Sequence, residues 1–170
     1  AGEVCGKEAL LMLARELGLA EERPELLERL IIAIVPNLNA DGNERFSPDN
    51  RPGQDGPESM GQRANAQGLD LNRDWVKLDS PEARGIVRFM NEWDPIVIVD
   101  SHTTNGPRHE HVITHQGPKH PAGDAAVIAF ARDRFLPAID RRFAEATPWE
   151  AFVYGNFSAD KTRWTTYPAD

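Results

Sequence analysis

Apolar residues recur at helical spacing in the first thirty positions of the chain. The pattern predicts an amphipathic helix over residues 6–17, ended by Gly18. Its apolar positions i, i+3, i+4 and i+7 are Leu10, Leu13, Ala14 and Leu17. Residues 24–30 predict a short second helix, because a proline is tolerated in the first turn.

Two further helices are predicted beyond the middle of the chain. Residues 81–93 carry an apolar stripe, and Ser80 and Pro81 are typical of an N-cap and a first helical position. The last pattern predicts a helix over residues 124–144. Pro137 lies inside it, so we expect a kink there.

Two continuous apolar runs lie between these helices. Residues 30–35 and residues 96–99 are rich in Ile and Val, which is typical of strands buried on both faces. Helices that alternate with such strands predict an α/β fold with a mainly parallel or mixed central sheet and helices on both faces. The length predicts one domain over residues 1–170.

Composition narrows the function classes. The formal net charge is −8, so the chain lacks the basic surface expected of a nucleic-acid or anionic-membrane partner. Hydrophobic residues make up 40% of the chain, which is enough for a core. No apolar run approaches the roughly 20 residues that span a bilayer. The single cysteine excludes an internal disulfide framework.

Candidate chemistry follows the predicted strands, where open α/β sheets bind ligands. His102 comes directly after the second strand and suits a metal ligand, a catalytic base or a hydrogen-bonded structural role. The first strand leads into a long polar loop, residues 38–76, in which Asn72 and Arg73 could hold a carboxylate. That pair also fits an ordinary surface loop. Glu3 could simply complement the dipole of the helix it precedes.

Taken together, these pieces resemble the zinc carboxypeptidases of the carboxypeptidase A/B type. The most specific match is Asp-Leu-Asn-Arg-Asp-Trp at residues 70–75, following Asn-Ala-Asp-Gly at residues 39–42. The resemblance covers most of residues 1–106 in the family's order and is weak after residue 110. It implies the α/β fold of that family and a Zn²⁺ cofactor.

The resemblance also implies metal ligands. Glu3 matches the glutamate of the family's His-x-x-Glu motif, and His102 matches its later zinc histidine. Asp70 resembles the aspartate that orients the first zinc histidine. That first histidine would stand directly before Ala1, so this sequence departs from the motif.

The remaining implied roles concern the substrate. Arg63 resembles the arginine that polarises the scissile carbonyl, and Asn72 with Arg73 matches the pair that holds the terminal carboxylate. The implied partner is therefore a peptide with a free C-terminal carboxylate, cleaved at its last bond by metal-activated water. Members of the family are often secreted or periplasmic, and the resemblance favours such a location.

The start and the end of the sequence suggest a piece of a longer protein. It opens without Met, and nothing in residues 145–170 fits the family's general-base glutamate, which we expect beyond Asp170. With one zinc ligand and the base missing, we expect these 170 residues alone to be a poor or inactive enzyme.

Two alternatives remain open at this point. Zinc amidohydrolases that deacylate N-acyl amino acids, such as aspartoacylase-like enzymes, share the Asp-Leu-Asn-Arg motif and a His-Thr-Thr like residues 102–104. The Asn-Ala-Asp-Gly stretch and the helix after Ser80 fit the peptidase better. A non-catalytic relative that kept the peptide-binding loop and lost the metal is the other alternative.

Overall fold

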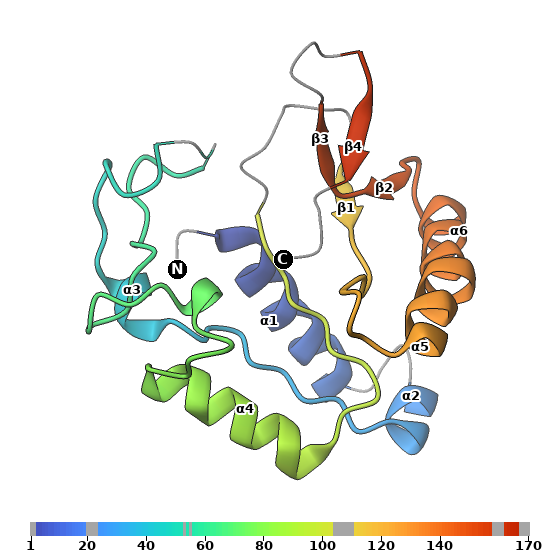
Figure 1. Cartoon of the computed structure of the whole chain (residues 1–170), viewed down its shortest axis with the longest axis horizontal. Helices are drawn as coiled ribbons and strands as arrows, with labels where there is room; N and C mark the ends of the chain where they lie inside the picture. Colours follow the sequence, from blue (N-terminus) through green and yellow to red (C-terminus); the bar gives the residue numbers. More distant parts are fainter. Residues whose placement is uncertain are drawn as a thin grey trace. The chain divides into compact units, whose positions relative to one another are not determined.

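The computed structural model forms two compact units, which span Ala1–Asn105 and Gly106–Asp170 (Figure 1). It describes residues 3–19, 24–52, 54, 56–103, 111–157 and 162–166. The expectation of one domain over residues 1–170 stays a prediction.

The first unit is built from helices and long irregular segments. Its helices are α1 (Val4–Leu19), α2 (Pro24–Arg29), α3 (Ala40–Glu44), the short 3-10 helix η1 (Leu71–Arg73) and α4 (Pro81–Trp93). The helices predicted at 6–17, 24–30 and 81–93 are therefore confirmed. Helices α3 and η1 lie inside the polar loop, which the sequence left without regular structure.

Helix α4 shows how local sequence sets a helix boundary. The Ser80 hydroxyl accepts a hydrogen bond from the Ala83 amide at 3.1 Å, and it donates one to the Asp74 carboxylate at 2.6 Å. At the other end Asp94 adopts a left-handed conformation, with φ of 44°, and its amide bonds to the Met90 carbonyl. Ala83 is buried at the inner side of the helix. Each terminus is thus closed by a specific side chain or backbone bond.

Replacing Ser80 by alanine is expected to lower the free energy of unfolding by about 1–2 kcal/mol. Ser80 is fully buried, so the change removes the helix cap and leaves the Asp74 carboxylate with one partner fewer. Urea unfolding followed by circular dichroism measures the difference. Ser80→Thr, which keeps the hydroxyl, is the control and should lose less.

The prediction of two central strands was wrong. Residues 30–35 and 96–99 have no strand assignment and are irregular chain in Figure 1. A strand needs a neighbouring backbone to complete its hydrogen bonds, and no strand pairing within the described part of the chain involves either segment. Their side chains are accordingly exposed rather than buried, up to 82% for Ile31 and fully for Ile96.

The second unit carries the strands. Strand β1 (Ile113–His115) pairs in parallel with β2 (Ala151–Val153), with Ile113 opposite Ala151. The connection between them is helical, through α5 (Ala125–Phe130), the π-helical turn η2 (Ala131–Phe135) and α6 (Leu136–Ala146). Strands β3 (Gly155–Phe157) and β4 (Trp164–Thr166) form an antiparallel pair. Parallel strands joined by a helix confirm the α/β class, in a smaller sheet than predicted.

The helix predicted at 124–144 is observed as a continuous helical run over residues 125–146, and the kink expected at Pro137 stays a prediction. Asp124 caps the start by accepting hydrogen bonds from the Ala126 and Val127 amides. Pro137 has no amide hydrogen to offer the carbonyl four residues earlier. The π-helical turn η2 ends at Phe135, two residues before the proline, and the Leu136 amide bonds to the Ala131 carbonyl.

Candidate active site

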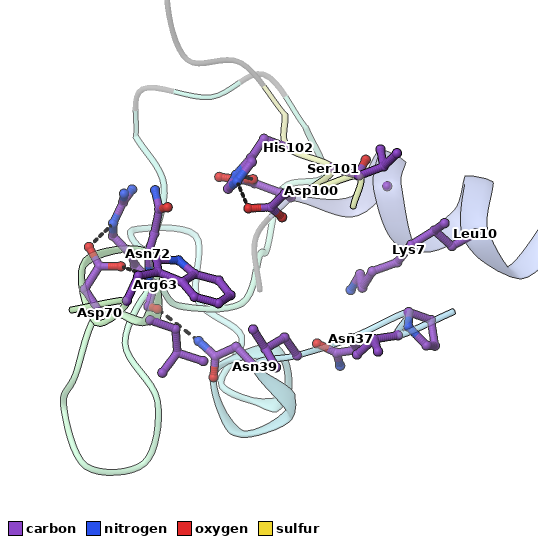
Figure 2. Close-up of a pocket in the computed structure, with 18 of the residues that line it drawn as sticks. Lys7, Leu10, Asn37, Asn39, Arg63, Asp70, Asn72, Asp100, Ser101 and His102 are labelled. Carbon is purple, nitrogen blue, oxygen red and sulfur yellow. Dashed lines mark hydrogen bonds and ion pairs between the residues drawn. The ribbon is translucent and has the colours of Figure 1, made fainter. Parts of the chain in front are cut away.

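A cavity of about 200 Å³ lies in the first unit and gathers most of the predicted site residues (Figure 2). Its lining includes the predicted residues Glu3, Arg63, Asp70, Asn72 and His102. Arg73 is not among the lining residues. Its exposed guanidinium donates a hydrogen bond to the backbone carbonyl of Asn72 at 3.1 Å.

Close packing of α1 against residues 100–103 brings Glu3 to His102. Gly6 is buried in the first turn of the helix, and a Cβ atom there would lie only 2.6 Å from the Ser101 hydroxyl oxygen. A larger residue at this position would force the Ser101 side chain to move. With this packing, the Oε2 atom of Glu3 lies 2.8 Å from Nδ1 of His102, although 99 positions separate them in sequence.

Glu3 and His102 each have a further hydrogen-bond partner beside this contact. Nε2 of His102 lies 3.0 Å from the Asp100 carboxylate, and the Thr103 amide donates to Oε2 of Glu3 at 3.2 Å. Hydrogen bonds to Asp100 and Glu3 raise the pKa of His102 from 6.5 to about 10. Burial alone would raise the pKa of Glu3, but the bonds from His102 and Thr103 outweigh it and lower that pKa from 4.5 to about 2. In the metal-free protein His102 is therefore an imidazolium ion between two carboxylates.

This ion pair gives the metal-free protein a defined pH dependence. His102 binds its proton more tightly when folded, so its contribution to stability is complete below pH 6.5 and is lost as the pH rises to about 10. Glu3 acts in the opposite sense: its contribution is present above pH 4.5 and is lost as the pH falls to about 2. We expect an NMR titration of the His102 ring to show a midpoint near 10, lowered in Asp100→Asn. A wild-type midpoint near 6.5 would contradict this account.

Arg63 is held at two points: its side chain bonds a carboxylate, and its backbone carbonyl accepts a hydrogen bond from a side-chain amide. Its Nε atom donates to Oδ2 of Asp70 at 2.6 Å, so the two terminal nitrogens of the guanidinium are left for other partners. The Asn39 amide donates to the Arg63 carbonyl at 2.9 Å, and its oxygen accepts the Gly42 amide at the start of α3. The Asn-Ala-Asp-Gly stretch thus positions Arg63 (Figure 2).

The segment that presents Asn72 is organised by one buried amide. The Asn65 side chain is 1% exposed, and its oxygen accepts from the amides of Gln67 and Leu69 at 3.0 and 2.9 Å. Its nitrogen donates to Glu82 in the first turn of α4. Asp70 then caps η1 by accepting from the Asn72 amide at 3.0 Å. Side-chain hydrogen bonds therefore order the polar loop, together with the buried side chains of Met60 and Leu71.

The atom types at the Glu3–His102 contact suit zinc, but the distance between the two atoms does not. Carboxylate oxygen and imidazole nitrogen are both zinc ligands, about 2.0–2.2 Å from the ion. Two such ligands on a tetrahedral ion lie roughly 3.3–3.5 Å apart, so the observed 2.8 Å needs to open by about half an ångström. Among the residues that the structure describes, no group of three or more His, Cys, Asp or Glu side chains is arranged to hold a metal ion.

Several residues that lie at the site were not predicted from the sequence. Arg51 and Gln54 reach the site from the polar loop. Lys7 lines the cavity (Figure 2). Its ammonium donates a hydrogen bond to the Asn43 side chain. Asp100, two positions before His102, had a usable signal, because metal-bound histidines commonly donate their second ring N–H to a carboxylate. The loop residues lack periodicity or a motif that would have marked them.

The zinc carboxypeptidase family model matches residues 1–94, more than half of the chain. The chain belongs to the zinc carboxypeptidase family. The family is one of zinc-dependent hydrolases of peptides, which agrees with the donor types gathered at the cavity. The matched range includes Glu3, Arg63 and residues 70–73, whereas His102 lies outside it. No curated protein and no solved structure matches the chain.

None of the helices in the described ranges is long and apolar enough to cross a membrane.

Proposed function

We propose that the protein is a zinc-dependent carboxypeptidase that hydrolyses the C-terminal peptide bond of its substrate with a metal-activated water. The observation that carries the proposal is that Glu3, His102, Arg63 and Asn72 line one cavity in a chain of the zinc carboxypeptidase family. These residues come from three separate parts of the sequence: the position before α1, the polar loop and the segment that follows residue 99.

Glu3 and His102 are the residues that would hold the zinc ion. Oε2 of Glu3 and Nδ1 of His102 lie 2.8 Å apart, so the two atoms would bind one ion after the shared proton is lost and their separation opens. When bound, zinc lowers the pKa of a coordinated water and polarises the substrate carbonyl. Binding has to displace the His102 proton, so we infer that zinc affinity rises with pH.

Asp100 orients the His102 ring for this role. A neutral imidazole keeps one N–H, and Asp100 accepts from Nε2, which leaves the lone pair on Nδ1. The tautomer that ligates a metal through Nδ1 is therefore the tautomer that this carboxylate favours.

Arg63 is the proposed electrophilic partner of the carbonyl oxygen. Asp70 fixes its Nε side, so its terminal nitrogens are presented with little loss of side-chain entropy. A positioned cation of this kind stabilises the negative charge that develops on the carbonyl oxygen as water attacks. Arg63 acts as a donor and retains its own proton.

Asn72 and Arg73 are the proposed holders of the substrate's terminal carboxylate. The Asn72 side chain lines the cavity, and the exposed Arg73 guanidinium follows it in η1. A cavity of about 200 Å³ also suits a single terminal residue better than a drug-sized ligand, whose pockets are about 300–1,000 Å³. Because only a chain end carries a free carboxylate, this anchoring supports an exopeptidase.

In the full-length protein, Arg73→Ala is expected to raise KM for a peptide with a free C-terminus by roughly 10- to 100-fold, the value of one or two charged hydrogen bonds. The corresponding amidated peptide should lose much less. Steady-state kinetics on both peptides measure the difference, with Arg88→Ala on the exposed side of α4 as the control.

Equal losses for the two peptides would refute the anchoring role. Preferential turnover of N-acyl amino acids over peptides would instead favour an amidohydrolase of the aspartoacylase type.

A further inference from the structure

Asn65 is a buried amide that joins the polar loop to helix α4. Its side chain is 1% exposed, and its nitrogen lies 3.2 and 3.1 Å from the two carboxylate oxygens of Glu82. A buried amide destabilises the fold unless it is hydrogen-bonded, so Glu82 is the acceptor that the Asn65 nitrogen needs. The Asn65–Glu82 pair connects positions that are 17 residues apart.

The turn that follows Asn65 is closed by its own backbone. The Asn65 amide donates to the Leu69 carbonyl at 2.9 Å, and the Gly68 amide donates to the Asn65 carbonyl at 3.1 Å. Gly68 has a φ of 78°, in the left-handed region that favours glycine. The Asn65 side-chain oxygen binds the amides of Gln67 and Leu69 in the same turn. Residues 65–69 thus form one closed turn around this side chain.

The closed turn joins the two parts of the loop that carry the proposed substrate-binding residues. Ala64 and Asp70, on either side of the turn, pair as an antiparallel bridge. Asp70 then binds the Arg63 side chain through Oδ2 at 2.6 Å and the Asn72 amide through Oδ1 at 3.0 Å. Arg63 and Asn72 both line the cavity. The turn therefore sets how far the Arg63 side chain lies from Asn72.

The other end of the same segment is fastened to the start of the same helix. Asp74, which directly follows Arg73, is 5% exposed. Its carboxylate accepts hydrogen bonds from the amides of Asp79 and Ser80 at 2.8 and 2.7 Å. Because both ends of residues 65–74 are tied to one helix, the residues between them have little freedom to shift.

The Asn65–Glu82 pair lies outside the cavity. Neither residue is among those that line it. The polar atoms of the Asn65 side chain are also occupied by Gln67, Leu69 and Glu82. Any effect of the pair on a substrate must therefore act through the residues that the loop carries.

We propose that Asn65 and Glu82 are positioning residues that hold Arg63 at a fixed separation from Asn72 and Arg73. The inference rests on the proposed function, in which Arg63 binds the scissile carbonyl and the other two residues bind the terminal carboxylate. These two groups of a substrate are one residue apart, so their binding points need a matching, fixed separation. A misplacement of about 1 Å in such groups can lower a rate by roughly 10²-fold.

The test compares kinetic constants with stability in the full-length protein. The substrates are one acetylated dipeptide with a free C-terminus and its C-terminal amide. Glu82→Ala leaves the Asn65 nitrogen without its acceptor and is expected to lower kcat/KM for the free peptide by about 10- to 100-fold. Both kcat and KM should change, because the carbonyl-binding and carboxylate-binding residues shift together. The preference for the free peptide over the amide should fall by about 3- to 10-fold.

Three variants separate position from stability. Glu82→Gln keeps an oxygen that can accept from Asn65 and should stay within about 3-fold of wild type. Glu92→Ala removes an exposed glutamate from the same helix and should leave the kinetic constants unchanged. Asp124→Ala removes the cap of α5 in the second unit, so it lowers stability without altering the loop. All constants are normalised to the folded fraction, which circular dichroism measures on the same samples. Equal kinetic losses in Asp124→Ala and Glu82→Ala would overturn the inference.

The remaining outcomes separate this inference from the function on which it rests. If Arg73→Ala raises KM while Glu82→Ala keeps the wild-type constants and preference, the pair only stabilises the fold, and the proposed function stands. If Arg63→Ala and Arg73→Ala both leave the constants unchanged, the proposed function fails and the inference fails with it. If Glu82→Ala does not fold, Asn65→Asp decides, because it keeps the oxygen that closes the turn and places a second carboxylate against Glu82. Wild-type constants in that variant overturn the inference.

Discussion

Replacing His102 by alanine in the full-length protein is expected to lower zinc affinity by more than about 100-fold and to abolish peptidase activity. Loss of a direct ligand has to exceed the 10- to 100-fold effect of losing an outer partner. Zinc sites also depend on completing a full ligand set. Glu3→Gln, which preserves the shape of the side chain but removes its charge, is expected to act in the same direction. Chelator competition and a peptidase assay on the same samples measure both effects.

Two variants control for the change of residue type. Glu8→Gln changes an exposed carboxylate on the same helix α1, and His120→Ala removes an exposed imidazole. Both are expected to bind zinc as tightly as wild type. Tight stoichiometric zinc in His102→Ala would show that the metal ligands are misassigned.

The second large effect is expected at Arg63. Arg63→Ala should reduce kcat by about 10²- to 10³-fold, as removal of one donor to a developing oxyanion does elsewhere, with a small change in KM. Zinc affinity should stay within a few fold of wild type, because Arg63 contacts Asp70 and neither of the proposed ligands. Steady-state kinetics on the zinc-loaded enzyme measure the two constants separately.

Arg63→Lys tests geometry against charge. Lysine keeps the positive charge but not the fork that bonds Asp70 on one side and leaves terminal donors on the other. We therefore expect only partial recovery of kcat. A rise in KM with kcat unchanged would assign Arg63 to ground-state binding rather than to stabilisation of the transition state.

The helices were predictable because their signals are local. Ser80 and Pro81 mark the start of α4, and the structure confirms both the cap and the position. Asp124 likewise caps the start of α5, at the residue where the sequence began the predicted helix. Each of these features depends on bonds within a few residues of one another, which a single sequence contains.

The strands were not predictable in the same way. The apolar runs at 30–35 and 96–99 have the composition of buried strands, yet a strand exists only where a second backbone completes the ladder. An apolar composition indicates that a segment is suited to burial. Whether the segment forms a strand depends on pairing with residues far away in sequence. The short strands β1 and β2, in contrast, lie in a part of the chain where no run of that kind stood out.

The same difference between local and long-range signals applies to the residues of the site. The proximity of Glu3 and His102, and of Arg63 and Asn72, followed from motifs that the family resemblance supplied. The contact between Arg51 and Glu3 spans 48 positions and starts from a loop without periodicity, so no local pattern marks it. Long-range contacts between side chains of irregular segments require the fold itself.

The most direct test of the central claim is anomalous diffraction at the zinc absorption edge from crystals of the full-length protein loaded with zinc. We expect one strong anomalous peak in the cavity, about 2.0–2.2 Å from both Oε2 of Glu3 and Nδ1 of His102. The same measurement on Glu3→Gln should show the peak weakened or absent. A zinc peak bound by other residues, with Glu3 and His102 still paired only to each other, would contradict the assignment of this cavity as the zinc site.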